Sequence, residues 1–168
     1  MQLSLKLCEQ TDLPALNQLA AQGNHAIEPR YFETAFQEQR DKKRIILLAF
    51  QDSSLVGYAH LNFFPQYAPF LRLNIPEIQD IFVHPDLRRQ GIGEQIIAAC
   101  EGEARHLSFT DIGIGVGVLG HFGSAQRLYH RMGYMPDGNG AVFERIPVQP
   151  GDMRPIDDRL CLMLLKQL

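Results

Sequence analysis

The feature that most constrains the fold is a strand, a glycine-bearing loop and a long helix that follow one another. Residues 77–83 are rich in β-branched and aromatic side chains and predict a strand. Residues 91–107 keep the apolar spacing of a helix. The first N–H groups of a helix have no partner inside it, and Gly91 and Gly93 leave them uncovered. Such a start can bind a phosphate group, and a plain strand-to-helix connection is the alternative.

Apolar alternation and periodicity predict the remaining elements. The predicted strands span residues 3–7, 45–50, 55–64, 111–118, 142–146 and 159–165. The predicted helices span residues 13–22, 29–43 and 124–132. This order predicts a mixed α/β sheet with helices packed on its faces. With no linker or repeat, residues 1–168 are expected to form a single domain.

Composition limits the partners and the location. The formal net charge is -3, whereas a nucleic-acid partner usually requires a basic excess. Cys8, Cys100 and Cys161 are far apart, so we expect buried thiols in a reducing compartment and no metal cluster. Residues 1–6 lack the long apolar core of a signal peptide, and no apolar run approaches the roughly 20 residues of a membrane span. We therefore expect a cytoplasmic protein with no membrane partner.

Two motifs resemble those of the GNAT N-acetyltransferase superfamily. Residues 88–93, Arg-Arg-Gln-Gly-Ile-Gly, match its Gln/Arg-x-x-Gly-x-Gly/Ala motif. Residues 125–134 resemble its helix Ala-x-x-Leu-Tyr-x-x-x-Gly-Phe/Tyr. The two lie in the family's order with a strand between them, and the resemblance covers nearly the whole chain. It implies the GNAT fold, a central, mostly antiparallel twisted sheet of about six to seven strands with helices on both faces, splayed at the fourth and fifth strands.

The resemblance implies acetyl-CoA as cosubstrate and no metal. The backbone of the strand end would pair with the pantetheine arm, as an added strand pairs with a sheet edge, through Ile81, Phe82 and Val83. The loop and the first helical turn would bind the pyrophosphate through Arg88, Arg89, Gln90, Gly91, Ile92, Gly93 and Glu94. Many members carry an asparagine three residues before the alanine of the tyrosine helix. Phe122 stands there, and Ser124 is the candidate to replace that contact.

The strand at residues 111–118 has one face made of glycine. Because side chains alternate along a strand, Gly113, Gly115 and Gly117 share a face opposite the branched residues. Glycine inside a strand often marks close approach of a backbone or ligand. The resemblance implies room for the cofactor arm and acceptor, and tight packing of a helix on the sheet is the alternative.

Tyr129 is the candidate catalytic acid. The resemblance implies that this tyrosine lies near the cofactor sulfur and can protonate the leaving thiolate, and an unperturbed phenol can act as such an acid. The alternative is a structural role in the apolar stripe with Leu128 and Met132.

Glu77 and Asp80 are the candidate bases, because a protonated amine must lose a proton before it attacks a thioester. Some family members carry a glutamate base at the position of Glu77. Simple alternation puts the two carboxylates on opposite faces, and the family's bulge on this strand could change that. A solvent-facing carboxylate is the alternative for each.

The predicted function is direct transfer of an acetyl group, in a ternary complex, to a primary amine of a small molecule or peptide. The resemblance places acceptor contacts in residues 25–31 and 64–76 and leaves a homodimer open. The alternatives are a non-catalytic acyl-CoA-binding or sensor domain, and a transferase with a different acyl group or acceptor.

Overall fold

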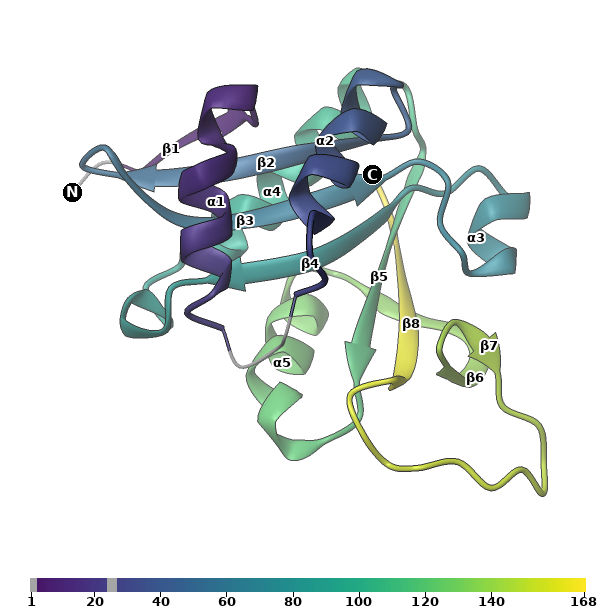
Figure 1. Cartoon of the computed structure of the whole chain (residues 1–168). Coiled ribbons are helices and arrows are strands. Elements are labelled where there is room, and N and C mark those ends of the chain that lie inside the picture. Colours follow the sequence, from purple (N-terminus) through teal and green to yellow (C-terminus); the bar gives the residue numbers. More distant parts are fainter. Residues whose placement is uncertain (1–2, 24–26) are drawn as a thin grey trace. The chain divides into compact units, whose positions relative to one another are not determined.

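The structure, a computed structural model, describes residues 3–23 and 27–168 (Figure 1). The chain forms two compact units. The first unit comprises Met1–Asn62 and Ile78–Glu103, and the second comprises Phe63–Glu77 and Ala104–Leu168. Each unit is described by itself.

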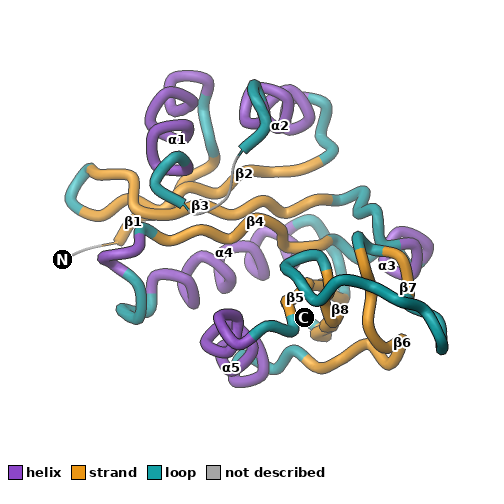
Figure 2. Tube along the Cα trace, turned by 60° about the horizontal axis from the view of Figure 1, so that its bottom comes forward, coloured by secondary structure: helices purple, strands orange, loops and turns teal. Residues whose placement is uncertain are grey.

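The first unit is a sheet with helices on both faces. Its strands lie in the order β1 (Leu3–Leu7), β2 (Arg44–Gln51), β3 (Ser54–Asn62) and β4 (Glu77–Val83). The pairs β1–β2 and β2–β3 are antiparallel. The helices α1 (Leu13–Ala20) and α2 (Tyr31–Arg40) cover one face, and α4 (Ile92–His106) covers the other (Figures 1 and 2).

Apolar spacing explains why these helices pack where they do. The helix α1 begins with a proline in its first turn, as predicted, and buries Leu16, Leu19 and Ala20. Phe32 and Ala35 of α2 are buried in the same cluster, which also includes strand residues. The resulting core lies between the two helices and the sheet, and it fixes the position of the strand that leads into the predicted loop.

The second unit holds four strands in the order β5 (Asp111–Gly117), β8 (Leu160–Gln167), β6 (Met135–Phe143) and β7 (Ile146–Pro147). The pairs β5–β8, β6–β8 and β6–β7 are antiparallel. Figure 1 shows β5 and β8 side by side, with the short β6–β7 hairpin next to β8. The helices α3 (Ala68–Arg72) and α5 (Gly123–Arg131) complete the unit.

The glycine face of β5 is filled by side chains of its own unit. A Cβ at position 113 would lie 2.0 Å from Cε2 of Phe70, on α3, and a Cβ at position 117 would lie 2.3 Å from Cδ2 of Phe122. A Cβ at position 115 would lie 3.6 Å from the guanidinium of Arg145. Of the two explanations for these glycines, the structure shows packing within the protein. The packed groups are two aromatic rings and an arginine side chain rather than a whole helix.

The predicted mixed, mostly antiparallel fold is confirmed, but the strand count is wrong. The described residues form eight strands, where six to seven were expected. The extra strand arises because the predicted strand 142–146 contains a reversal: Glu144 and Arg145 adopt left-handed φ of 50° and 67°, and the chain turns back as β7. The short helix α3 was not predicted, although Pro69 suits its first helical turn.

The three cysteines are free and buried, as expected. No helix in the described ranges is both long enough and apolar enough to cross a membrane.

Candidate active site

The loop before α4 exposes the start of a helix of 15 residues. Arg88, Arg89, Gln90 and Gly91 are all exposed. Gly91 adopts φ +83°, and a Cβ placed there would meet nothing within 4 Å. Arg89 has a left-handed φ of 62°, a strained conformation for a residue with a side chain. Because the helix dipole adds partial positive charge to unpartnered N–H groups, this open start fits a diphosphate.

Arg88 connects the loop to the end of β4. Its Nε donates to the carbonyl oxygen of Val83 at 3.2 Å, and its guanidinium lies 5.9 Å from the ring centroid of Phe82. The carbonyl predicted to pair with a pantetheine arm therefore already accepts one bond, and its second lone pair is the one a ligand would use. Ile81, Phe82 and Val83 are half-buried, so this strand end is only partly covered.

Asp80 interrupts β4 with a left-handed φ of 53°. A residue in this conformation within a strand is typical of a bulge, which re-aims the side chain. The hydroxyl of Tyr31 donates to Oδ2 of Asp80, and Nδ1 of His60 lies 3.8 Å from the same oxygen. The Asp80 side chain is 48% exposed, so it is held at one oxygen while it remains accessible to a ligand.

His60 lies next to Tyr31 and Asp80 inside the core. It is fully buried, and its ring stacks on that of Tyr31 with centroids 5.7 Å apart and an angle of 8°. Burial lowers the pKa of His60 to about 4, against a smaller opposing effect of Asp80 and a further lowering by Arg44. Since Nη1 of Arg44 lies 3.0 Å from Nδ1, that nitrogen accepts and the imidazole is neutral at pH 7.

A pocket of about 320 Å³ opens beside Asp80. Its walls are aromatic or aliphatic except for two carboxylates. The lining residues come from α1, α2, β3, β4 and the α1–α2 connection: Ala20, Gly23, Ile27, Glu28, Tyr31, Tyr58, Asp80, Ile81 and Phe82. The rings of Tyr58 and Phe82 stack with centroids 5.5 Å apart. The pocket thus adjoins the strand residues predicted to meet the cofactor arm.

Glu77 has a different environment from Asp80. Its side chain is fully buried, and Oε1 lies 2.7 Å from Nη2 of Arg145. The Arg145 side chain is 27% exposed and lies over Gly115 of β5. The two candidate bases therefore differ: Glu77 is enclosed and neutralised by an arginine, whereas Asp80 borders a pocket.

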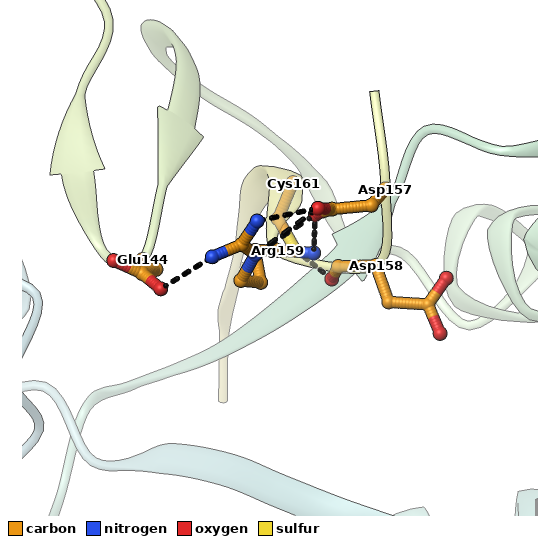
Figure 3. A network of polar contacts seen from close by, with 5 residues as sticks. All are labelled: Glu144, Asp157, Asp158, Arg159 and Cys161. Atoms are coloured by element: carbon orange, nitrogen blue, oxygen red, sulfur yellow. Dashed lines mark hydrogen bonds and ion pairs between the residues drawn. The ribbon is translucent and has the colours of Figure 1, made fainter. Parts of the chain in front are cut away.

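The turn that carries Arg145 is also held from outside (Figure 3). Arg159 donates to Glu144 at 3.1 Å and to Asp157 at 2.7 Å. These groups are exposed, so each ion pair is weak, but together they connect the turn to the long segment before β8. The left-handed turn is thereby fixed with Arg145 directed towards Glu77.

Tyr129 and Ser124 belong to α5 in the second unit. Ser124 is exposed in the first turn of the helix. Tyr129 is buried, and its ring centroid lies 6.2 Å from that of Tyr134. Burial raises the pKa of the Tyr129 phenol to about 12, so the hydroxyl keeps its proton at neutral pH.

The predicted acceptor segments divide into two kinds of residue. Tyr31 lines the pocket, and residues 25 and 26 lie outside the described residues. In the other segment Tyr67 and Phe70 are core residues, and Tyr67 donates to Asp137 at 2.6 Å. Sequence reasoning missed Tyr58 and Arg145, because neither residue stands in a pattern that indicates a site.

A metal site was not expected. Within residues 3–23 and 27–168, no three His, Cys, Asp or Glu side chains gather where they could hold a metal ion.

Solved N-acetyltransferases share this fold. Ribosomal-protein-alanine N-acetyltransferase from Brucella melitensis is 20% identical, with a TM-score of 0.72 over 98% of this chain and 99% of that chain. The yncA protein from Salmonella typhimurium, solved with acetyl-CoA, is 15% identical, with a TM-score of 0.73 over 99% and 94%. The PaiA N-acetyltransferase from Thermoplasma acidophilum, in complex with coenzyme A, is 15% identical, with a TM-score of 0.71 over 100% of both chains.

The sequence model of the Acetyltransferase (GNAT) family matches residues 13–134, more than half of the chain. The chain therefore belongs to the GNAT acetyltransferase family, which confirms the resemblance of its two motifs. Comparison with curated protein sequences gives no significant match.

Neutral, buried His60 predicts an acid-sensitive fold. In the unfolded chain this imidazole takes up a proton near pH 6.5, whereas in the folded chain it does so only near pH 4. Between these values the unfolded state binds more protons, so the stabilisation present above pH 6.5 is lost as the pH falls towards 4. The loss is on the order of 3 kcal/mol. Urea denaturation from pH 4 to 7 should show a shallower decline for His60→Phe than for the parent, and equal slopes would contradict this account.

The Arg145–Glu77 pair predicts a large stability loss for one arginine of the hairpin. Arg145→Met removes the cation from beside the buried Glu77 carboxylate, which should lower the free energy of unfolding by about 3 kcal/mol. The matched control is Arg159→Met, which removes an exposed arginine of the same hairpin region and should cost only a small fraction of that loss. Urea denaturation of both variants measures the difference, and similar losses would show that the Arg145–Glu77 pair is not the stronger contact.

Proposed function

We propose that the chain transfers the acetyl group of acetyl-CoA directly to a primary amine of a small molecule or peptide, within a ternary complex. The observation that carries the proposal is the exposed loop before α4, where Gly91 at a left-handed φ brings no side chain to the helix start at which an anion would bind. Membership of the GNAT family supports the same reaction class. Two fold relatives solved with acetyl-CoA or coenzyme A support the same cosubstrate.

The cosubstrate site is assigned to two segments of the first unit. Residues 88–94 hold the diphosphate through backbone amides, with the charges of Arg88 and Arg89 at the rim. The backbone of Ile81–Val83 pairs with the pantetheine arm. Ser124 replaces the asparagine contact that the family motif carries. Bound acetyl-CoA supplies an acetyl group already activated as a thioester. Holding the amine close to the thioester carbonyl, in the correct orientation, therefore provides much of the rate acceleration.

Asp80 is the better candidate for the residue that receives the amine. An amine is mostly protonated at neutral pH, and an ammonium is stabilised beside an accessible carboxylate. Asp80 is half exposed at a pocket, whereas Glu77 is fully buried and paired with Arg145. We therefore assign Asp80 to binding the ammonium and accepting its proton, directly or through water, and Glu77 to structure.

Tyr129 is assigned to the leaving thiolate, as the family motif suggests. Its pKa of about 12 exceeds that of an alkyl thiol, about 8.5, so complete proton transfer would be uphill. The hydroxyl therefore contributes chiefly a hydrogen bond to the sulfur as negative charge develops there. One hydrogen bond to a charged group is worth about 1.5–3 kcal/mol, or roughly 10- to 100-fold in rate.

Two further features of the chain support the proposed type of acceptor and the proposed cellular compartment. A net charge of -3 disfavours a nucleic-acid acceptor. Three buried free thiols agree with a reducing compartment, and we place the enzyme in the cytoplasm.

Thiol release from acetyl-CoA across a panel of amines and peptides tests the proposal. With an acceptor that reacts, Tyr129→Phe should lower kcat by roughly 10- to 100-fold, because one hydrogen bond to the developing thiolate is lost. The affinity for coenzyme A, measured by calorimetry, should change little. Tyr134→Phe, which removes the hydroxyl of the neighbouring buried ring, is the matched control and should retain turnover.

Unchanged kcat in Tyr129→Phe would remove the assignment of that residue. Binding of acetyl-CoA without thiol release on any amine or peptide would contradict the proposed transferase and favour a non-catalytic sensor.

A further inference from the structure

The pocket beside Asp80 is formed by rigid aromatic walls. Tyr31 stacks on buried His60, and Tyr58 stacks on Phe82. Gly23 permits this arrangement, because a Cβ there would lie 3.0 Å from Cε2 of Phe82. Walls locked by packing hold their shape before a ligand arrives, which lowers the entropy cost of binding. The faces of aromatic rings also attract cations.

The charged side chains among the described lining residues all have the same sign. Glu28 and Asp80 are its carboxylates, and none of the described lining residues is cationic. A ligand ammonium is attracted by this lining, whereas a ligand carboxylate is repelled. The lining thus separates amines from amino acids, whose carboxylate lies one carbon from the amine.

The backbone of Asp80 sets the direction of its side chain. A left-handed φ of 53° within β4 is typical of a bulge, which turns the carboxylate out of the regular alternation of the strand. Within the described residues, the contacts of Asp80 with Tyr31 and His60 both use Oδ2. Oδ1 is left for a ligand in the pocket.

The size and place of the pocket fit a small acceptor. Its volume of about 320 Å³ is near the lower end of small-molecule sites, roughly 300–1,000 Å³. Its lining includes Ile81 and Phe82, the residues assigned above to the cofactor arm. An amine held at Asp80 would therefore lie next to the strand end where the thioester is expected.

We propose that this pocket selects, as acetyl acceptor, a small primary amine with an aromatic or aliphatic body and no carboxylate beside the amine. The inference rests on the proposed function and specifies its substrate class. The Asp80 carboxylate binds the ammonium, Tyr31 orients Asp80, and Tyr58 and Phe82 contact the body of the amine. Glu28 extends the negative field towards the exposed side of the pocket.

Matched pairs that differ only by the α-carboxylate test this proposal. The pairs are phenethylamine and phenylalanine, tyramine and tyrosine, and isoamylamine and leucine, each assayed with saturating acetyl-CoA. The expected result is a kcat/KM at least about 10-fold higher for the amine in at least one pair, and no pair in which the amino acid is better. Equal values, or a preference for the amino acid, would overturn the proposal.

Variants identify the source of the preference. Asp80→Asn and Glu28→Gln should each reduce the ratio of kcat/KM between amine and amino acid. Because the readout is a ratio, a general loss of activity in Asp80→Asn does not affect it. Glu28→Gln changes an exposed side chain and should fold normally. The control is Glu33→Gln, an exposed carboxylate of α2 outside the pocket, which should leave the ratio unchanged.

The outcomes separate this inference from the function on which it rests. Acetylation of peptide N-termini without reaction of any small amine would overturn the amine pocket and leave the transferase intact. Absence of thiol release with every acceptor, in a protein that binds acetyl-CoA, would overturn both.

Discussion

The open start of α4 is the feature on which the account depends. A helix start binds an anion only if its amides are uncovered and the helix itself is fixed. The left-handed residues Arg89 and Gly91 provide the first condition. Packing provides the second: Ile96 and Ile97 are fully buried, and a Cβ on Gly57 of β3 would lie 2.9 Å from Cδ1 of Ile96. A small residue in β3 thus lets the helix approach the sheet closely, beside the strand that leads into the loop.

The two carboxylates of β4 show how one strand can serve two purposes. Glu77 is enclosed with an arginine delivered by a left-handed turn, so its charge is used to hold the β6–β7 hairpin. Asp80, three residues later, is turned by its own left-handed φ into contact with Tyr31 and the neutral His60. A buried paired charge stabilises only as a pair, whereas a half-exposed one can accept a ligand. The difference in burial therefore suits Glu77 to a structural role and Asp80 to binding a ligand.

Local patterns in the sequence predicted most elements to within a few residues. The strand Glu77–Val83 and the strand Leu3–Leu7 match in full, because alternation and β-propensity agree there. The β6–β7 reversal was missed because Glu144 and Arg145 are not residues that usually adopt left-handed φ, and long-range ion pairs hold them in it. Local sequence carries no signal for contacts of that kind.

The site could be predicted only in part for the same reason. The glycine loop and the two carboxylates were visible as motifs, but the choice between Glu77 and Asp80 depends on which distant side chain meets each one. The glycines of β5 predicted a close approach by another group. The groups that approach are the rings of Phe70 and Phe122, and they come from segments with no periodic pattern. Tyr58 belongs to an apolar strand, and only the fold reveals that its side chain lines the pocket.

A crystal structure with coenzyme A tests the central claim most directly. The account predicts diphosphate oxygens about 3 Å from the backbone nitrogens that open α4, at residues 91–94, with the pantetheine arm along Ile81–Val83. A diphosphate bound elsewhere on the chain, or a helix start that stays covered by the protein's own side chains at saturating coenzyme A, would contradict it.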